Sequence, residues 1–347
     1  MPHTVKALIT PGPKAPFAAG TIDRREPGPA DVVIAIEYSG VCHSDIHTAR
    51  AEWGETIYPL VPGHEIAGTV TAVGSAVQKH ALGDRVGVGC YVDSCGACQY
   101  CLAGQEQHCD KGAVFTYNSR DYQGDPTLGG YSAEIVVGQD YVLKIPDALD
   151  LAHAAPLLCA GITLYAPLKE WGAGPGVRVG IVGMGGLGHM GVKLASALGA
   201  EVTVLSRTLA KQADGLQFGA QAYRATSDPK TFTELALSFD LLISTVSATG
   251  EIDTLLGLLG TNGTLVFVGM PPGPQSVSIS PLTTRRRKIA GSLIGGIALT
   301  QEMLDFCAAH GVAPEIELIT ADQVDATYDR VVAGDVRYRA VIDAHSI

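Results

Sequence analysis

The sequence V-R-V-G-I-V-G-M-G-G-L-G at residues 177–188 decides the fold of the second half of the chain. Four of its first six residues are Val or Ile, which predicts a strand at 177–182, and a helix is expected at 190–198. With a second strand expected at 202–205, the order of elements predicts a parallel, doubly wound α/β sheet. The G-x-G-x-x-G spacing permits a tight turn, close approach of a pyrophosphate and packing of the helix on the strand. We therefore predict a Rossmann dinucleotide-binding domain whose phosphate loop contains Gly183, Gly185, Gly186, Leu187 and Gly188.

The residues after the second expected strand bear on which dinucleotide is bound. NAD-binding domains of this kind carry an acidic residue about 20 residues beyond the glycines, where it hydrogen-bonds the adenosine ribose. Here that position reads Leu205-Ser206-Arg207-Thr208, and Lys211 follows one turn later. The missing carboxylate and the hydroxyl, guanidinium and ammonium donors favour the 2′-phosphate of NADP. The alternative is that Arg207 and Lys211 belong to an ordinary solvated helix start.

The first 150 residues predict a different pattern of secondary structure. Short β-type runs separated by turn signals occur at 32–36, 66–70 and 85–88, which indicates a β-rich region. In the second half, further strands and a helix are expected at 241–244, 264–268 and 301–310. The 347 residues correspond to about two domains at roughly 150 residues each. The tail after Gly311 is therefore too short for a third domain.

Composition and charge exclude several classes of protein. Apolar residues make up 46% of the chain and charged residues 17%, so a large core can form and the composition is not that of a disordered protein. A net charge of −11 disfavours binding to the phosphate backbone of nucleic acids. The N-terminus lacks the apolar core of a signal peptide, and the longest uncharged stretch, 254–284, is interrupted by glycine and proline. We therefore expect a cytoplasmic chain without a membrane span.

Eight cysteines are too few for a disulfide scaffold in a chain of this length, and clustered cysteines in a reducing compartment are more often metal ligands. Four of them follow the spacing C-x2-C-x2-C-x7-C: Cys95, Cys98, Cys101 and Cys109. Four thiolates close a tetrahedron around Zn²⁺ and leave no position for substrate, which indicates a structural zinc that orders a lobe at about 90–110. A reduced, unligated loop or a pair of disulfides is the alternative. Cys90 and Cys307 lie outside the spacing and are interpreted as small apolar residues.

A second group of potential metal ligands is spread along the chain. The sequence G-V-C-H-S-D-I-H occupies 40–47, G-H-E follows at 63–65, and Cys159 precedes Ala-Gly near the start of the α/β half. One cysteine, one histidine and a second cysteine would give the three-ligand arrangement of a catalytic zinc site, in which the fourth position stays open for water or substrate. Taken singly, each of these residues is more often part of a core.

Together these motifs resemble the zinc-containing medium-chain dehydrogenase/reductase superfamily, and within it the cinnamyl alcohol dehydrogenase-like group of NADP-dependent alcohol dehydrogenases. The resemblance runs nearly end to end and includes P-G-H-E at 62–65, C-A-G-I-T at 159–163, G-M-G-G-L-G-H at 183–189 and R-Y-R-A-V-I-D at 337–343. It implies a β-rich GroES-like catalytic domain, 1–155 and 296–347, and a Rossmann NADP-binding domain, 156–295. Relatives commonly dimerise through the nucleotide-binding domain, so a homodimer is expected.

The resemblance further implies roles for single residues around the metal. Cys42, His64 and Cys159 would bind the catalytic zinc, and Glu65 is a carboxylate able to approach the metal when water leaves. The proton relay and its supporting carboxylate match Ser44, His47 and Asp45.

Other matches concern the cofactor and the substrate. His43 and Arg339 lie where the superfamily contacts phosphate, Thr163 matches a residue beside the nicotinamide, and the backbone at Val268 matches a contact to its carboxamide. Trp53 and Phe115 fall at pocket positions whose identity varies in the group, so substrate identity is not carried over.

These roles imply a zinc-dependent alcohol dehydrogenase or aldehyde reductase. Zinc would lower the pKa of a bound alcohol, Ser44 would pass the proton towards solvent through the nicotinamide ribose and His47, and NADP would accept the hydride. An NAD-linked polyol dehydrogenase of the same superfamily would normally carry an acidic residue in place of Ser206. A zinc-free quinone reductase-like member would lack Cys42, His64 and the four-cysteine lobe. A non-catalytic zinc- and NADP-binding protein is the remaining alternative.

Overall fold

Two separate sheets organise the chain in the computed structural model, which describes residues 3–248 and 252–347. One unit comprises Met1–Cys159 and Gly295–Ile347, and the other comprises Ala160–Ile294. The expected boundaries, after residues 155 and 295, lie four residues before and one residue after the observed ones. The tail of the chain thus joins the N-terminal unit.

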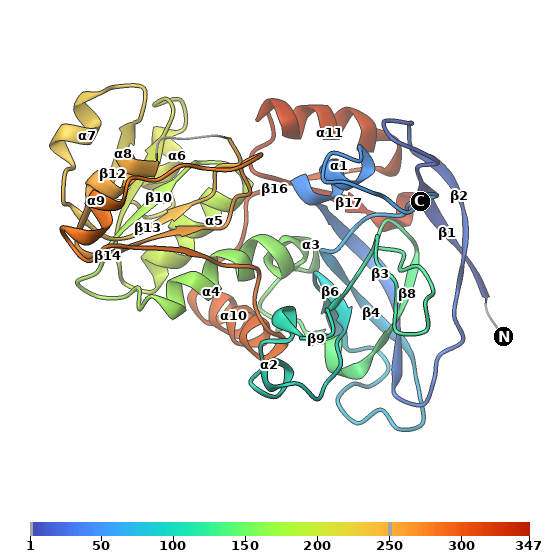
Figure 1. Ribbon diagram of the computed structural model, residues 1–347. Coiled ribbons are helices and arrows are strands. Elements are labelled where there is room, and N and C mark those ends of the chain that lie inside the picture. The colour runs from blue at the N-terminus through green and yellow to red at the C-terminus, as the bar shows by residue number, and fades with distance from the viewer. Residues whose placement is uncertain (1–2, 249–251) are drawn as a thin grey trace. The chain divides into compact units, whose positions relative to one another are not determined.

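The first unit is built on a seven-stranded sheet with the order β16-β17-β3-β4-β5-β9, and β8 also pairs with β3 (Figure 1). Its strands are β3 (Asp31–Val41), β4 (Ile66–Val73), β5 (Arg85–Val88), β8 (Glu134–Gly138), β9 (Leu143–Lys144), β16 (Ile316–Ile319) and β17 (Arg339–Asp343). All pairs are antiparallel except β16 with β17. The register sets Ala340 of β17 opposite Val41 of β3, which brings the last strand beside the segment that follows β3.

Smaller elements complete this unit. The short two-stranded sheets are β1 (His3–Ile9) with β2 (Ala18–Arg24) and β6 (Tyr91–Asp93) with β7 (Val114–Phe115). The helices are α1 (His43–Ala49), α2 (Gln99–Leu102), α3 (Leu151–Pro156), α10 (Ile297–His310) and α11 (Val324–Ala333). Apolar side chains of β3, β4, β5 and β8 form one buried cluster, which includes Ile34, Ile66 and Val86. The β-rich reading of the first 150 residues is confirmed.

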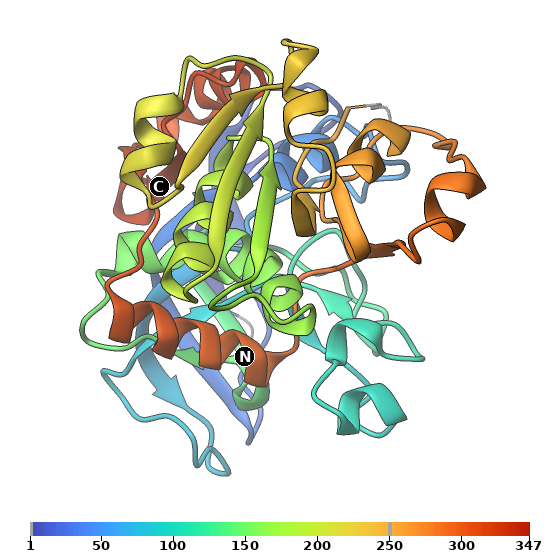
Figure 2. The ribbon, with the colours of Figure 1, turned by 90° about the vertical axis from the view of Figure 1, so that its left-hand side faces the viewer.

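The second unit contains a six-stranded parallel sheet with the order β12-β11-β10-β13-β14-β15 (Figure 2). Its strands are β10 (Arg178–Val182), β11 (Glu201–Ser206), β12 (Ala222–Ala225), β13 (Phe239–Ser244), β14 (Leu259–Phe267) and β15 (Lys288–Gly291). The helices are α4 (Ile162–Glu170), α5 (Gly186–Ala197), α6 (Gln212–Gln217), α7 (Lys230–Glu234), α8 (Ile252–Leu258) and α9 (Ile279–Thr283). Because the chain starts at the central strand β10 and winds outward in both directions, the predicted doubly wound sheet is confirmed.

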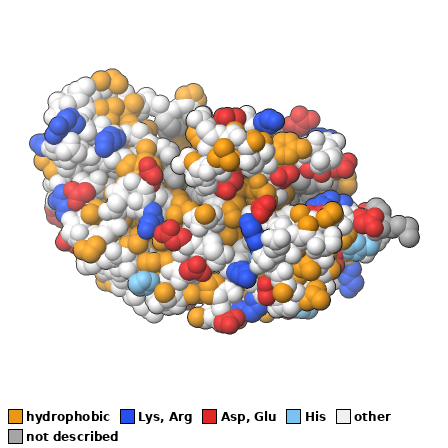
Figure 3. Space-filling model, turned by 90° about the horizontal axis from the view of Figure 1, so that it is seen from below, with side chains coloured by type: hydrophobic (Ala, Val, Ile, Leu, Met, Phe, Trp, Pro, Cys, Tyr) orange, Lys and Arg blue, Asp and Glu red, His pale blue; other side chains and the backbone are white. Residues whose placement is uncertain are grey.

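One helical stretch has the length and composition of a membrane span. It is Leu151–Glu170, whose most apolar window has a mean hydropathy of 1.5, and 83% of that window is buried within the folded chain. A core helix has the same properties, so this feature by itself is weak support for a membrane span. On the face of the molecule drawn in Figure 3, acidic and basic side chains are interspersed among apolar ones.

Candidate metal and cofactor sites

Tertiary packing of the first unit brings together four ligand side chains from three parts of the sequence. The ligand atoms of Cys42, His64, Glu65 and Cys159 all lie within 4.8 Å of one another, and all four residues are buried. Cys42 follows β3 and is the N-cap of α1, whereas His64 and Glu65 directly precede β4, the neighbour of β3 in the sheet. Cys159 lies in a π-helical turn, Leu157–Gly161, and π turns within helices occur frequently at functional sites.

Asp45 supports this group from behind. Its fully buried carboxylate accepts hydrogen bonds from the backbone N–H groups of Cys42 (2.9 Å) and Gly63 (3.0 Å) and pairs with Nδ1 of His64 (3.1 Å). Burial alone would lower the pKa of His64, but Asp45 raises it well above its ordinary value. A carboxylate on Nδ1 fixes the ring and leaves Nε2 as the atom for a metal ion. Asp45 therefore lies one hydrogen bond outside the ligand group.

Glu65 and Arg339 form a buried ion pair beside the thiols. Glu65 is 0% and Arg339 4% exposed, and the guanidinium donates to Oε1 of Glu65. The Arg339 side chain is expected to reach phosphate, and in the structure it lies on Glu65, as its place beside β3 in the register allows; its Nε has no hydrogen-bond partner among the described residues, so the phosphate contact stays a prediction. Desolvation raises the pKa of Glu65 to about 7, while Arg339 lowers it. A Cβ at position 40 would lie 1.9 Å from Oε2 of Glu65, so Gly40 is required for this packing.

The donor set fits a zinc ion. Oε2 of Glu65 is buried and has no hydrogen-bond partner within the described residues, which leaves it available to a cation. Cys42 and Cys159 are free thiols whose sulfurs lie 3.9 Å apart. Hydrogen bonding to Cys159 lowers the pKa of Cys42 well below its ordinary value, His64 adds to this, and burial opposes it. Two thiolates, one imidazole and an optional carboxylate are ligands that Zn²⁺ accepts in a catalytic site.

The predicted relay residues lie on α1. The Oγ of Ser44 is 3.7 Å from Sγ of Cys42, next to the ligand group. His47 lies further out, with Nδ1 2.6 Å from a carboxylate oxygen of Glu52 and its ring stacked on Trp53 at a centroid distance of 4.7 Å. Glu52 was missed by the sequence analysis, although an acidic residue five positions after a relay histidine could have indicated it. Trp53, expected at the substrate pocket, is 49% exposed and packs on this histidine.

The four-cysteine lobe is also assembled. The sulfurs of Cys95, Cys98, Cys101 and Cys109 lie within 4.8 Å of one another, with 3.5 Å between Cys98 and Cys101 and 3.9 Å between Cys95 and Cys101. Zn–S bonds of about 2.3 Å in a tetrahedron set sulfurs about 3.8 Å apart, whereas a disulfide requires about 2.05 Å. The four thiols are free, so they fit a zinc site and are not paired as disulfides. Hydrogen bonding from the backbone N–H of Cys101 lowers the pKa of Cys98 to about 6, which favours the thiolate.

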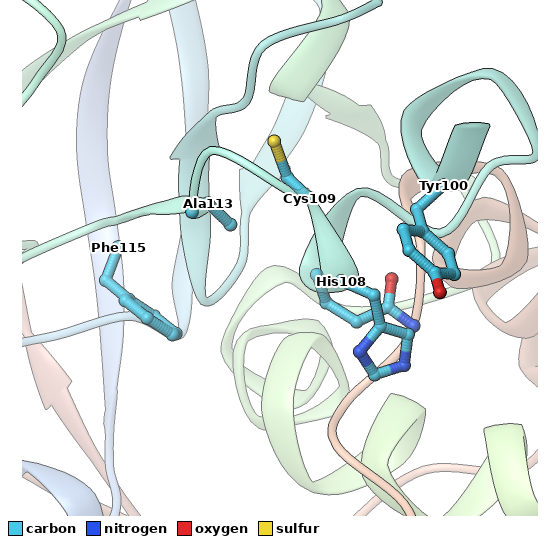
Figure 4. A pocket seen from close by; sticks show the side chains of 7 residues that line it. Tyr100, His108, Cys109, Ala113 and Phe115 are labelled. Carbon is cyan, nitrogen blue, oxygen red and sulfur yellow. The ribbon is translucent and has the colours of Figure 1, made fainter. Parts of the chain in front are cut away.

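An open cavity lies next to this lobe. Its volume is about 560 Å³, and Figure 4 shows Phe115 on one side with Tyr100 and His108 together on the other. Phe115, expected at the substrate pocket, is 44% exposed and lines this cavity. The lining of the cavity comes from the lobe and the residues that follow it, and it includes none of the ligand group around Cys42.

The phosphate loop of the second unit has the expected geometry. Gly183 follows β10 with φ of +100°, and a Cβ there would lie 2.5 Å from the Thr245 hydroxyl. A Cβ at Gly188 would lie 2.1 Å from the carbonyl oxygen of Gly183, so the helix packs against the turn as only glycine allows. Gly185 is the N-cap of α5, and Gly186 and Leu187 are the first two residues of this twelve-residue helix. The free N–H groups at the start of the helix therefore lie at the loop.

The remaining residues that were predicted to contact the cofactor differ in burial and lie in both units. Ser206 ends β11, Arg207 and Thr208 are exposed after it, and Lys211 directly precedes α6. Thr163 is buried in the first turn of α4, and the Val268 backbone N–H, which follows β14, donates to the carbonyl of Ser244 at 3.0 Å. His43 begins α1 in the other unit and is exposed.

Comparisons with known proteins cover both units. Two family models match: the alcohol dehydrogenase GroES-like domain over residues 28–147 and the zinc-binding dehydrogenase over residues 186–309. The chain is 58% identical over 344 residues to NADP-dependent alcohol dehydrogenase C of Mycobacterium bovis and 57% identical over 345 residues to the probable formaldehyde dehydrogenase AdhA of Bacillus subtilis, with 99% of each chain covered. The structure of a cinnamyl alcohol dehydrogenase from Sorghum bicolor matches with a TM-score of 0.96 and 41% identity, covering 99% of this chain and 98% of that one.

Proposed function

Because the chain belongs to the zinc-containing medium-chain dehydrogenase/reductase superfamily, in its cinnamyl alcohol dehydrogenase-like group, we propose that it transfers hydride between NADP(H) and primary alcohols or aldehydes. Aromatic, allylic and medium aliphatic compounds are the proposed substrates. One observation carries the proposal: two thiols, an imidazole and a carboxylate with one unpartnered oxygen converge beside a hydroxyl and a histidine on the same helix. Cys42, His64 and Cys159 would hold a zinc ion that supplies Lewis acidity, and Ser44 and His47 are groups that can accept and pass a proton beside it.

When bound, zinc supplies Lewis acidity and NADP(H) supplies the hydride acceptor or donor. The chain's own residues would hold the metal and transfer the proton. Cys42, His64 and Cys159 would hold the metal, and Asp45 keeps the His64 ring in place. Ser44 accepts the hydroxyl proton of the alcohol, and His47 with Glu52 carries it outward to solvent. In aldehyde reduction the same groups return the proton.

The residues after β11 support NADP(H) over NAD(H). The segment contains no carboxylate, and Arg207 is an exposed cation directly after the strand end where the adenosine ribose binds in Rossmann domains. Each charge-assisted contact to a phosphate contributes roughly 1.5 to 3 kcal/mol. Removal of both cations in Arg207→Ala with Lys211→Ala is therefore expected to weaken NADPH binding by about two to four orders of magnitude and to leave NADH binding nearly unchanged.

The proposal is tested by measuring kcat/KM on a panel of aromatic, allylic and aliphatic aldehydes with NADPH and with NADH. We expect turnover with NADPH to exceed that with NADH by at least a hundredfold, and the double variant to lose this preference. The matched control removes two exposed cations elsewhere in the same unit, Arg285→Ala with Arg286→Ala, and should retain the preference. Turnover of sorbitol-like polyols with NAD would favour the polyol dehydrogenase alternative, and no turnover of any substrate by zinc-loaded protein would favour a binding protein.

The two clusters support a count of two zinc ions per chain, one on each ligand group. Elemental analysis of the purified protein should give two equivalents. We also propose a cytoplasmic location, supported by eight free cysteines, and no nucleic-acid partner, supported by the net charge of −11.

A further inference from the structure

The hydroxyl group of Ser94 lies against the four-cysteine lobe. Its Oγ is 3.1 Å from Sγ of Cys101, and the Tyr141 hydroxyl donates a hydrogen bond to the same Oγ at 2.7 Å. Ser94 is 7% exposed, and Tyr141 packs against the apolar cluster of the seven-stranded sheet. The sulfur of one lobe cysteine is thus connected to the core of the first unit through two side chains that the sequence analysis did not single out.

The direction of these two hydrogen bonds follows from which of the three groups carries a hydrogen that it can donate. A metal-bound Cys101 is a thiolate and can only accept. The Tyr141 hydroxyl donates its hydrogen bond to Oγ of Ser94, so the Ser94 hydroxyl is free to donate its own hydrogen to the sulfur. The order Tyr141, Ser94, Cys101 is therefore a directed chain, in which Tyr141 orients Ser94 and Ser94 donates to the thiolate.

We infer that Ser94, oriented by Tyr141, is a positioning residue that stabilises the Cys101 thiolate and sets how firmly the lobe retains its zinc. This inference rests on the zinc proposed for the lobe. A hydrogen bond to a thiolate withdraws electron density from sulfur, which makes the sulfur a weaker nucleophile towards electrophiles. Outer hydrogen-bond partners of metal ligands typically change metal affinity by 10- to 100-fold when they are removed. Cys101 is half-buried, and without this donor its thiolate also loses part of the compensation for its desolvation.

A second tyrosine provides a matched contrast. The Tyr122 hydroxyl lies 3.8 Å from Sγ of Cys109, which is a long contact for a hydrogen bond to sulfur. It donates its hydrogen bond to the carbonyl oxygen of Gly112, at 2.8 Å. Its proton is therefore unavailable to the thiolate. Removal of this hydroxyl leaves the charge of the cysteine sulfur unaltered, although the hydroxyl also lies beside a lobe sulfur, at 3.8 Å compared with 3.1 Å for Ser94.

The experiment measures zinc release and cysteine alkylation in the full-length, zinc-loaded protein treated with N-ethylmaleimide. Zinc is followed with a chromophoric chelator, and alkylated positions are assigned by peptide mass spectrometry. Ser94→Ala should release the lobe zinc and become alkylated at Cys101 about 10 to 100 times faster than the parent. Ser94→Thr, which keeps the hydroxyl, should behave like the parent, and Tyr141→Phe should lie in between because Ser94 keeps its proton but loses its orientation.

Two further readouts separate this role from general loosening of the lobe. With Co²⁺ in place of zinc, Ser94→Ala should shift the thiolate charge-transfer band to longer wavelength, whereas Tyr122→Phe should leave the band and the release rate unchanged. Alkylation at Cys42 should be the same in all variants. Equal release from Ser94→Ala and the parent, or equal acceleration by Tyr122→Phe, would overturn the inference. A parent with a single zinc, held by Cys42 and His64, would overturn the lobe zinc and the inference while leaving the proposed activity intact.

Discussion

The two oxygens of the Glu65 carboxylate have different surroundings. Oε1 is held by the Arg339 guanidinium, and Oε2 packs against Gly40 without a hydrogen-bond partner among the described residues. The pair is almost completely buried, and removal of one member of such a pair typically costs about 3 to 5 kcal/mol because the other charge is left uncompensated. Arg339 thus holds Glu65 near the metal ligands without saturating it.

We predict that Glu65→Gln lowers the free energy of unfolding of the zinc-loaded protein by about 3 kcal/mol or more. The double variant Glu65→Gln with Arg339→Met should be less destabilised than the single variant, because no unpaired guanidinium remains. Urea unfolding followed by near-UV circular dichroism measures the double variant and the two single variants, Glu65→Gln and Arg339→Met, after zinc content has been checked. A double variant that is as unstable as the sum of the two single variants would show that the two side chains do not compensate each other.

The relay residues are predicted to contribute unequally to turnover. Ser44→Ala removes the inner proton acceptor and should lower kcat by about 10² to 10⁴, the usual range for acid–base assistance. His47→Gln should cost less, because solvent can partly replace an outer member, and Glu52→Gln should cost least. Added buffer base should restore part of the loss in the His47 variant. Zinc content should stay unchanged in all three. Equal turnover of Ser44→Ala and the parent, with hydride transfer shown to be rate-limiting, would rule out the relay.

Among the helices and strands, local sequence was sufficient to predict those whose pattern repeats within a few residues. The strand ending at Val182, the glycine turn and α5 were predicted because periodicity and glycine spacing are local signals. The helix at 301–310 was recognised but begins earlier, at Ile297, because its N-cap is Gly296. β12 (Ala222–Ala225) was not predicted, since four residues with one tyrosine give too weak a pattern.

The sites depend on contacts that the sequence order hides. Cys42 and Cys159 are 117 positions apart and meet only through packing of the first unit, so their joint role came from the family resemblance and not from spacing. By contrast, Cys95, Cys98 and Cys101 lie within seven residues, and their spacing alone predicted a cluster. Glu52 and Ser94 were missed because a hydrogen bond from a loop residue to a histidine or a thiol leaves no periodic signal.

The start of β3 is held by a buried charge. The Asp31 carboxylate accepts from the Arg25 guanidinium (2.7 Å to Oδ1) and from the backbone N–H of Gly28 (2.6 Å). Burial alone would raise the pKa of Asp31, but these hydrogen bonds hold it below its ordinary value. Because the folded-state pKa is lower than the unfolded-state value of about 3.9, the stabilisation is present above that pH and is lost as the pH falls through the folded-state pKa.

We therefore predict that Asp31→Asn lowers the free energy of unfolding by about 1 to 3 kcal/mol at pH 5 to 7. The difference from the parent should shrink below pH 4, where the parent carboxylate also becomes neutral. Unfolding midpoints in urea at several pH values measure this. The control is Asp140→Asn, which breaks an exposed pair with Lys79 and should change stability by less than about 1 kcal/mol. A difference that persists unchanged at pH 3 would contradict an electrostatic origin.

At the scale of the whole molecule, one edge of the six-stranded sheet bears on the predicted homodimer. β15 is the last strand of the six-stranded sheet, with β14 on one side and no strand of the described residues on the other. Unpaired strand edges are templates for pairing with another chain, and natural monomers usually protect them with charge or proline. β15 carries one such charge, the exposed Lys288 at its first residue, and Ile289, Ala290 and Gly291 are uncharged. Two exposed apolar side chains lie on or directly after this strand: Ile289 and Leu293, with exposed fractions of 38% and 45%. An edge of this kind suits a second copy of the same chain.

We predict that the protein is a homodimer in solution and that β15 is part of the interface. Ile289→Lys places a charge on the strand edge. A stable dimer interface buries about 1,200 to 2,000 Å² of surface. A lysine that is buried in such an interface without a partner should therefore weaken association strongly. Light scattering coupled to gel filtration should give twice the chain mass for the parent and a mass that falls on dilution for the variant. Leu102→Lys, at a more exposed apolar residue of the first unit (75% exposed), is the control and should remain dimeric. A parent that elutes with the mass of one chain at micromolar concentration, or an Ile289→Lys protein as dimeric as the parent at every dilution, would exclude this edge as the interface.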